Sequence, residues 1–293
     1  MWKEIHVNTT EQQAEVISDE LLALGAKAIT FLDAGDQPIY EPPTESFLLW
    51  KQTTVVGLFE DTQLLTPVFE HLKAQQLYFH IHEVPNEDWV KRSLDSFEPL
   101  LFGKHLWIVP SWHVPKDENA INVMLDPGLA FGTGTHPTTG LCLTWLENHI
   151  RPQSIVIDYG CGSGILGIAA LKLGAKQVFA VDNDPQALTA TQANGEINQF
   201  FPPKLTVCTP HDLTAPLADL IIANILAKPL IELAPYFATL VKSPGNVVLS
   251  GILASQVESV LLAYQPWFYM ETPVLHGEWA RLVGSKIPEI KKA

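Results

Sequence analysis

Apolar positions in the first 85 residues recur with the two periods that distinguish helices from strands. Helical spacing of apolar residues predicts helices over residues 10–24 and 64–74. Short apolar or alternating runs predict strands at residues 5–7, 28–32, 47–50, 54–59 and 79–84. In chain order these elements predict a small α+β domain of the ferredoxin-like type, with the order βαββαβ.

The first helix carries both a start and a stop signal. Thr10 and Gln13 have the spacing of a capping box, in which each side chain bonds the other residue's backbone N–H. Gly25 is placed to end the helix.

After residue 98 the pattern changes to apolar strands that alternate with helical stretches. Strands are expected at residues 106–109, 154–158, 177–181, 205–208, 220–223 and 246–251. Repeated β-α-β units predict an α/β domain with a mostly parallel sheet and helices on both faces. Residues 86–98 are polar with scattered apolar positions and predict a linker helix between domains at residues 1–85 and 99–293.

The composition, 47% hydrophobic and 17% charged over 293 residues, is typical of a soluble globular protein. No run of eighteen apolar residues predicts a membrane-spanning helix, and the first residues lack the apolar core of a secretory signal. Cys142, Cys161 and Cys208 have neither a disulfide pattern nor metal-ligand spacing. We therefore expect a cytoplasmic monomer that has no metal site and does not contact a membrane.

Acidic residues concentrate near the start of the chain. The net charge is −14, and residues 1–85, with four basic and thirteen acidic residues, contribute −9 of it. An acidic domain attracts basic partners and repels phosphate backbones. Since no basic stripe is present to follow a nucleic acid, we expect no direct nucleic-acid binding. The alternative interpretation is a solvated surface whose charge keeps the protein soluble.

A glycine-rich loop follows the expected strand at residues 154–158. Three alternate glycines begin at Gly160, in the spacing G-x-G-x-G, and a helical stretch follows them. Asp182 lies twenty-two residues after Gly160, at the end of the next strand, where an acid can accept hydrogen bonds from both hydroxyls of an adenosine ribose. Alternatively, Asp182 caps the following helix, a role that Asn183 or Asp184 can also fill. The strand, loop, helix, strand and acid together favour an adenosine ligand.

S-adenosylmethionine suits this segment better than a dinucleotide does. A dinucleotide fingerprint has the spacing G-x-G-x-x-G and places a pyrophosphate at a helix N-terminus. S-adenosylmethionine has no phosphate, and Asp158, directly before the glycines, suits its cationic methionine arm. Asp212, after the strand at residues 205–208, is a candidate partner of the adenine amino group, although a loop acid is more often only solvated.

Residues 126–139 form a second segment rich in glycine and threonine. Thr138 or Thr139 is expected to cap the helix that begins at Gly140, which leaves amide donors for a carboxylate. A cap with no further role is the alternative. His136 is expected to pack or to face solvent, because nothing pairs it with a nucleophile or a metal.

The buried strand at residues 220–223 is followed by Asn224, in the position where a parallel sheet presents its ligands. The carbonyl oxygen of Asn224 can accept a hydrogen bond from an incoming amine and so aim the amine's lone pair at a methyl group. A turn residue without a catalytic role is the alternative.

Taken together, these segments resemble the methyltransferases that modify the eleventh protein of the large ribosomal subunit, and the resemblance extends over nearly the whole chain. The run FGTGTHPTT at residues 131–139 is its most specific part. The other matching parts are the N-terminal acidic domain, the linker, and residues 158–164, 223–227 and 249–253.

The resemblance implies a class I, Rossmann-like methyltransferase domain and a separate substrate-binding domain. It further implies that S-adenosylmethionine is the cofactor and that the partner is a basic ribosomal protein, methylated on lysine side chains and on its N-terminal amine. By position, the cofactor contacts that it implies are Thr139, Gly160, Asp182 and Asn224. Ile225 and Leu226 stand where Asn-Pro-Pro-aromatic is common in amino-methyltransferases, which suggests a site open to several kinds of amine.

The chemistry demanded by such a reaction agrees with this interpretation. A sulfonium is already an activated leaving group, so the enzyme must supply alignment and a neutral amine. A lysine is neutral about once in 2,500 molecules at pH 7, a cost of about 4.6 kcal/mol. Removal from water beside a cation lowers the amine pKa, so we expect no dedicated general base, and Asn224 is the expected catalytic residue.

Three other functions remain open on the sequence. The first is a methyltransferase that acts on another amine, in a small molecule or in adenine. The second is a non-catalytic sensor of S-adenosylmethionine, which has no need of an amine acceptor such as Asn224. The third is an oxidoreductase, which the glycine spacing disfavours.

Overall fold

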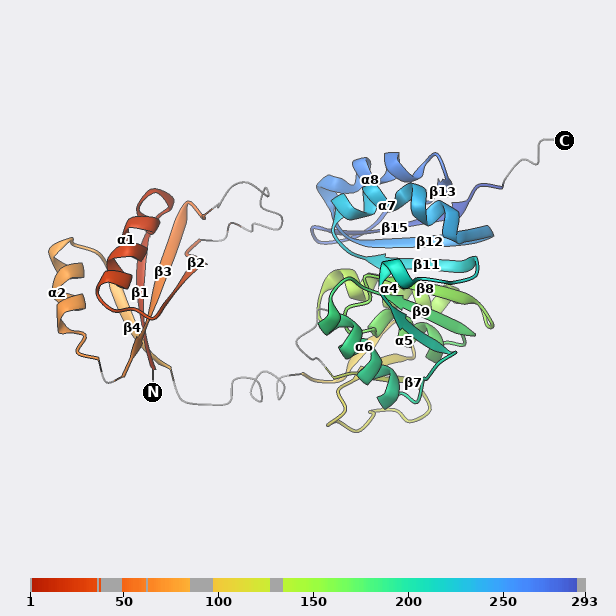
Figure 1. The fold of residues 1–293 in the computed structure, drawn as a ribbon, viewed down its shortest axis with the longest axis horizontal. Coiled ribbons are helices and arrows are strands. Elements are labelled where there is room, and N and C mark those ends of the chain that lie inside the picture. The colour runs from red at the N-terminus through yellow and green to blue at the C-terminus, as the bar shows by residue number, and fades with distance from the viewer. Residues whose placement is uncertain are drawn as a thin grey trace. The chain divides into compact units, whose positions relative to one another are not determined.

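The computed structural model describes residues 2–35, 37, 49–61, 63–84, 97–126 and 134–288 (Figure 1). The chain divides into two compact units, Met1–Arg92 and Ser93–Ala293. Most of the expected linker helix over residues 86–98 lies outside the described residues, and its last two, Phe97 and Glu98, are in neither helix nor strand. No helix in the described part of the chain combines the length and the apolar character needed to cross a membrane.

The N-terminal unit is a four-stranded antiparallel sheet with two helices. Its elements are β1 (Trp2–Thr10), α1 (Glu11–Ala23), β2 (Ala28–Asp33), β3 (Gln52–Glu60), α2 (Thr66–Ala74) and β4 (Phe79–Val84). The strand order is β2-β3-β1-β4, which is the ferredoxin-like arrangement that the sequence predicts. Side chains of both helices, such as Leu21 and Leu72, share one buried cluster with Ile5 and Val7 of β1.

Two local predictions for this unit are wrong. Leu49 and Trp50 are not in a strand, because β1 and β2 already occupy both sides of β3. Leu49 is instead buried in the core, and residues 47 and 48 lie outside the described part. Thr10 precedes α1 but its side chain makes no capping bond, and the Gln13 side chain accepts from the Thr9 hydroxyl at 3.3 Å.

The C-terminal unit is built on a large sheet whose strand order is β10-β9-β8-β11-β12-β15-β13. From β10 to β12 the strands are parallel, and β15 runs antiparallel to β12, β13 and β14. The bounds are β8 (Ile155–Tyr159), β9 (Gln177–Val181), β10 (Leu205–Cys208), β11 (Ala218–Asn224), β12 (Val241–Leu253), β13 (Phe268–Met270), β14 (Val274–His276) and β15 (Trp279–Lys286). The sheet is therefore mostly parallel, as predicted.

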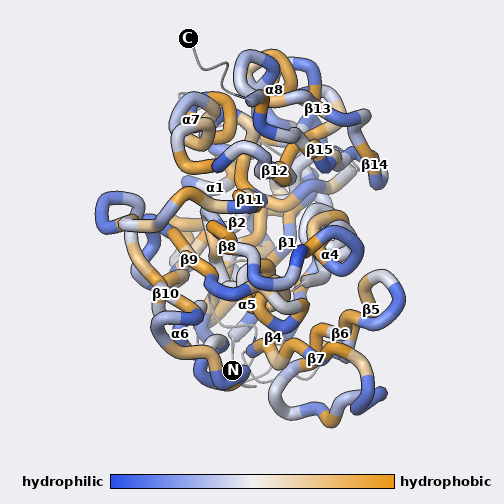
Figure 2. The backbone as a smooth tube through the Cα atoms, turned by 90° about the vertical axis from the view of Figure 1, so that its right-hand side faces the viewer, coloured by the Kyte–Doolittle hydropathy of each residue, from blue (hydrophilic) through white to orange (hydrophobic). Residues whose placement is uncertain are grey.

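Helices cover both faces of this sheet. They are α4 (Pro137–His149), α5 (Ile165–Lys172), α6 (Pro185–Ile197), α7 (Ala227–Leu240) and α8 (Val257–Tyr264). Val156 packs in a cluster with α4 and α5, and its neighbour Ile157 packs in a second cluster with α7 and α8. Because successive strand residues point to opposite faces, both faces of the sheet are apolar, and Figure 2 shows hydrophobic residues along β8, β9 and β11.

Several strands of this unit were not predicted. The strand predicted at residues 246–251 is confirmed as part of β12, but its first residues were missed because Ser243 to Gly245 are typical of turns. Strands β13 and β14 have only three residues each and were not predicted. Gly284 interrupts the apolar pattern of β15. Such segments become strands because a neighbouring strand pairs with them, which local pattern does not reveal.

A three-stranded sheet completes the unit, formed by β5 (Leu100–Phe102), β6 (Leu106–Val109) and β7 (Ile121–Met124). Only β6 was predicted. Leu106, Ile108 and Val123 belong to the same buried cluster as α4 and α5, so this sheet extends that core.

Two buried asparagines, Asn194 on α6 and Asn198 at its C-cap, connect β7 to the large sheet. The amide of Asn198 donates to Met124 O at 2.6 Å and accepts from Met124 N at 3.0 Å. Asn194 accepts from Asp126 N at 2.9 Å and donates to Ser163 O at 2.9 Å. Helix α6 thus holds the end of β7 and the glycine-rich loop with the same row of side chains.

Replacement of Asn198 by alanine is expected to lower the free energy of unfolding of the C-terminal unit by about 2–4 kcal/mol. The change removes the bonds to Met124 and leaves its part-buried N–H and C=O without these partners. Urea denaturation measures the effect. Asn148→Ala is the control, since Asn148 is exposed and bonds only Thr144 O of its own helix. An equal loss of stability in the two variants would contradict the stabilising role of the bonds between Asn198 and Met124.

Candidate functional site

The candidate site lies where three neighbouring parallel strands end. In the sheet β8 lies between β9 and β11, and Ile222 is opposite Asp158. Asn224, two residues later, is therefore level with Gly160, and Asp182 follows the last residue of β9. Because carboxyl ends of parallel strands meet at one edge, the structure brings three of the four predicted residues to the same place.

The loop after β8 has a conformation that requires glycine. Gly160 has φ +78°, and a Cβ atom there would lie 2.2 Å from Cγ2 of Ile225. The N–H groups of Gly160 and Cys161 donate to Val181 O at 2.7 and 3.0 Å, which turns the loop across the end of β9. Gly160 therefore carries no side chain at the end of β8, and the side chain of Ile225 packs against its backbone.

Asp182 is half-buried and faces the glycine loop. One carboxylate oxygen accepts from Gly162 N and the other from Asp184 N, each at 3.0 Å. Asp184, and not Asp182, caps α6 by accepting from Gln186 N at 2.8 Å. Each oxygen of Asp182 keeps a second lone pair, and the two can accept from a pair of ribose hydroxyls. Asp184 therefore fills the helix-capping role that was the alternative interpretation of Asp182.

Asp158 lies directly behind this loop with 1% of its surface exposed. One oxygen accepts from Gly167 N at 2.8 Å, and the other, Oδ1, has no partner among the described residues. Burial raises the pKa of Asp158 to about 7, helped by the charge of Asp182 and opposed by the Gly167 N–H. An approaching cation would favour the ionised carboxylate, which fits the predicted cationic arm of the ligand.

Asn224 and Thr139 meet although 85 positions separate them in the sequence. Asn224 Nδ2 donates to Thr139 Oγ1 at 3.2 Å, and Thr139 is buried in the first turn of α4. Asn224 Oδ1 is buried and has no hydrogen-bond partner within the described part of the chain. A buried acceptor without a donor costs about 1–3 kcal/mol, and an N–H donor supplied by a ligand would relieve that cost.

The start of α4 differs from the prediction. The helix begins at Pro137, and its N-cap is His136, whose ring nitrogen Nδ1 accepts from Thr138 N at 3.4 Å. The N–H of Thr139 donates to His136 O at 3.1 Å, so it is not left for an anion. Proline at the first helical position lacks an N–H and has a helical φ, which explains this earlier start. His136 also packs, as expected, with its ring 4.6 Å from that of Trp279.

Comparison with known proteins extends the argument to the whole chain. A model of the family described as ribosomal protein L11 methyltransferase (PrmA) matches residues 1–287. The chain belongs to this family. The resemblance carried by the short motifs is thereby confirmed.

Individual relatives agree with the family model. The ribosomal protein L11 methyltransferase of Marinomonas sp. (strain MWYL1) is 47% identical over 293 residues, with 97% of this chain and 99% of the relative covered. That of Glaesserella parasuis serovar 5 (strain SH0165) is 50% identical over 296 residues, with the same coverage of 97% and 99%. A crystal structure of a ribosomal protein L11 methylase from Lactobacillus delbrueckii subsp. bulgaricus has a TM-score of 0.59 and 34% identity, covering 65% of this chain and 99% of that chain.

Asp212 lies at the same edge of the sheet but is engaged locally. It belongs to a short 3-10 turn after β10, and its carboxylate accepts from the Thr209 hydroxyl at 2.7 Å. Bonds from Thr209 and His211 lower the pKa of Asp212. The structure shows no contact between Asp212 and the other candidate residues.

Two residues that support the loop were not predicted. The hydroxyl of Thr191, on α6, donates to Gly162 O at 2.9 Å, and Asn194 donates to Ser163 O. Both are buried. The signal was present in the sequence, since polar residues occupy buried positions at helical spacing after Ala187.

A cavity lined by residues including Trp145, His149 and Asp219 lies at the opposite ends of the strands. There Asp219 accepts from Ile155 N at 2.8 Å and pairs with Lys242. These bonds join the beginnings of β8, β11 and β12, so we assign this region a structural role.

The pH dependence of stability tests the state of Asp158. Its pKa is about 7 in the folded protein, whereas an unfolded chain has the ordinary value of about 3.9. The unfolded chain therefore ionises first, and this group lowers the stability of the fold as pH rises from about 4 to about 7. Asp158→Asn removes this effect while keeping an oxygen for Gly167 N.

The difference in the free energy of unfolding between Asp158→Asn and the unaltered protein is expected to grow, in favour of the variant, by about 1–3 kcal/mol from pH 5 to pH 8. Urea denaturation at several pH values measures the difference. The control, Asp117→Asn at an exposed loop position, should show no such trend. A difference for Asp158→Asn that is constant across this range would disprove the assignment.

Proposed function

We propose that this protein transfers methyl groups from S-adenosylmethionine to amines of ribosomal protein L11, both lysine side chains and the N-terminal α-amine. The observation that carries the proposal is the buried, unpartnered Oδ1 of Asn224 beside the glycine loop, in a chain of the L11 methyltransferase family. An amine substrate supplies the donor that this oxygen lacks.

The residues at the strand ends suit the parts of S-adenosylmethionine. The glycine loop brings backbone without side chains to this edge of the sheet, and the lone pairs of Asp182 suit the ribose hydroxyls. Asp158, behind the loop, offers a carboxylate to the cationic methionine arm. Thr139 would lie beside the ligand through its bond to Asn224. When bound, S-adenosylmethionine supplies a methyl group on a sulfonium, which is already a good leaving group.

Asn224 orients the substrate amine. Its Nδ2 is anchored on the Thr139 hydroxyl, so the amide plane is held and Oδ1 keeps a set direction. By accepting one N–H of the amine, Oδ1 directs the nitrogen lone pair away from itself and toward the methyl group. A neutral amide accepts this bond without stabilising the protonated ammonium as strongly as a carboxylate would, so the amine is easier to deprotonate.

Proton removal needs no dedicated base in this proposal. A lysine with a pKa of about 10.4 must lose its proton at a cost of about 4.6 kcal/mol at pH 7, and transfer into a site with a nearby cation reduces that cost. Asp158 is a poor candidate for the base, because it lies behind the loop and its carboxylate is bonded to Gly167 N.

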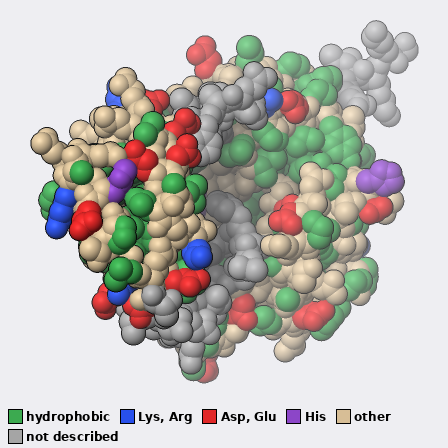
Figure 3. Space-filling model, turned by 60° about the vertical axis from the view of Figure 1, so that its left-hand side comes forward, with side chains coloured by type: hydrophobic (Ala, Val, Ile, Leu, Met, Phe, Trp, Pro, Cys, Tyr) green, Lys and Arg blue, Asp and Glu red, His purple; other side chains and the backbone are tan. Residues whose placement is uncertain are grey.

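We assign recognition of the protein substrate to residues 1–85. These carry −9 of the net charge of −14. Figure 3 shows acidic side chains on the surface of the N-terminal unit, and the exposed ones are Glu11, Glu15, Asp19, Glu60, Asp61, Glu70 and Glu83. Such a surface attracts a basic ribosomal protein and speeds encounter at low salt.

Asn224→Ala is expected to lower turnover by about 100-fold or more while the KM for ribosomal protein L11 changes less than about threefold, because the lost bond orients the reacting amine. Intact mass after incubation with S-adenosylmethionine and purified L11 shows methyl groups as steps of one methyl. Asn224→Asp keeps the acceptor but favours the ammonium, so its activity should shift to higher pH.

The control for this experiment is Asn148→Ala, which alters an exposed asparagine on α4 and should leave turnover unchanged. Wild-type rates in Asn224→Ala would remove Asn224 from the mechanism. Absence of any mass gain in the unaltered protein, despite binding of S-adenosylmethionine, would exclude ribosomal protein L11 as the substrate.

Neutralising the acidic surface tests substrate recognition. The triple variant Glu11→Gln, Glu15→Gln and Asp19→Asn is expected to raise the KM for L11 several-fold at low salt, with little effect at 0.5 M salt, where charges are screened. The matched control is Glu196→Gln, Glu258→Gln and Glu278→Gln on the C-terminal unit. A KM that is independent of salt in the unaltered protein would overturn electrostatic recognition.

A further inference from the structure

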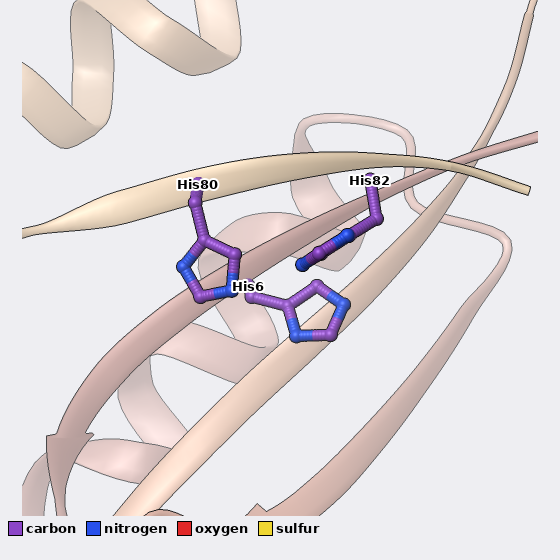
Figure 4. Close-up of side chains that lie close together, drawn as sticks. All are labelled: His6, His80 and His82. Atoms are coloured by element: carbon purple, nitrogen blue, oxygen red, sulfur yellow. The ribbon is translucent and has the colours of Figure 1, made fainter.

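Three histidines from two strands meet on the N-terminal unit, as Figure 4 shows, although His6 is more than seventy positions from His80 and His82. His6 comes from β1, and His80 and His82 come from β4. One ligand nitrogen from each lies within 4.8 Å of the others. The three ring centroids are 4.7 to 4.9 Å apart, so the rings form a nearly equilateral triangle.

Strand register brings these side chains together. In the antiparallel pair β1 and β4, His6 is directly opposite His80, and Glu4 is directly opposite His82. Ile5, between Glu4 and His6, points into the core. Because side chains alternate along a strand, Glu4 and the three histidines share the face away from that core.

The packing of three imidazoles calls for an explanation, since protonated rings in this arrangement would repel one another. Partial burial and the neighbouring rings of His6 and His82 lower the pKa of His80. Neutral imidazoles each have one nitrogen with a free lone pair, and this is the form that binds metals.

We propose that His6, His80 and His82 form a binding site for a divalent transition metal of the zinc class. Imidazole nitrogen is a preferred ligand of zinc, copper and nickel. Tetrahedral zinc with bonds of about 2.0–2.1 Å places its ligand atoms about 3.4 Å apart. The ligand nitrogens of the three histidines all lie within 4.8 Å of one another. Side-chain rotations that move each nitrogen by about 1 Å would bring them to the spacing that zinc requires.

Glu4 supports the site from outside the ligand triangle. Its Oε2 lies 2.9 Å from His6 Nε2, and an ionised carboxylate only accepts, so Nε2 carries the proton in this pair. The lone pair of His6 is then on Nδ1, which is left for the metal. Carboxylates commonly orient metal-binding histidines in this way, and they make the ring a better ligand.

The three ligands leave the fourth tetrahedral position for water. The acidic character of residues 1–85, with a net charge of −9, also favours a cation in this unit. A metal bound here would join the first and last strands of the N-terminal sheet and would stabilise the unit by mass action.

Titration of the untagged, full-length protein tests the site. After treatment with a chelator, the protein is titrated with Zn²⁺ in competition with a chromophoric chelator, and Co²⁺ is used to record visible absorption bands. We expect one metal ion per chain, an absorption typical of tetrahedral nitrogen ligands, and a zinc-dependent rise in the melting temperature of the N-terminal unit.

Removal of one ligand should weaken binding at least about tenfold. His82 is exposed, so His82→Gln does not disturb the core, and circular dichroism verifies that the variant is folded. His80→Gln should have the same effect, and Glu4→Gln should weaken binding by about 10- to 100-fold. The matched control is His71→Gln, a histidine of the same unit that bonds Glu20 and Gln75 instead.

The proposal is overturned by either of two results. One is an unaltered protein that binds no zinc in competition with the chelator. The other is unchanged affinity in folded His80→Gln and His82→Gln variants, which would place the bound metal elsewhere in the chain.

Discussion

Parallel pairing of β8 with β9 on one side and with β11 on the other is the constraint on which the candidate site depends. The backbone hydrogen bonds of these strands bring Gly160, Asp182 and Asn224 to one edge of the sheet. A slip of β11 by one residue would turn Asn224 into the packed layer beneath the helices. The register of a buried sheet thus controls the direction of the one acceptor that the proposed chemistry needs.

Buried polar side chains of α6 and its C-cap hold the neighbouring loops in place by hydrogen bonds to their backbone. Thr191 and Asn194 bond the glycine loop, and Asn198 bonds the end of β7. Each of these side chains satisfies backbone groups that strands and helices leave unpaired. The loop conformation, which the ligand must meet, is therefore part of the packed core of the unit and is held before any ligand binds.

The two units use charge in different ways. In the C-terminal unit, Asp158 is buried with its pKa raised to about 7, so the arrival of a cationic ligand would favour its ionisation. In the N-terminal unit, acids are exposed and numerous, and we propose that their combined field attracts a basic partner. The histidine cluster of His6, His80 and His82 brings three ring nitrogens within 4.8 Å of one another in that unit, and the proposed metal site would use them as ligands.

Local pattern in the sequence was sufficient to predict both fold classes, the glycine loop, and the position of Gly160, Asp182 and Asn224 at the ends of strands, because periodicity and turn chemistry depend on neighbours along the chain. Their roles toward a ligand stay predictions. Local pattern failed for the expected strand at residues 47–50, because β1 and β2 already pair with both sides of β3. It also failed for the start of α4, because Pro137 begins the helix earlier than expected. The bond between Thr139 and Asn224 and the histidine cluster were decided only by the tertiary structure. Such contacts join residues tens of positions apart, and only strand register and helix packing determine which of them meet.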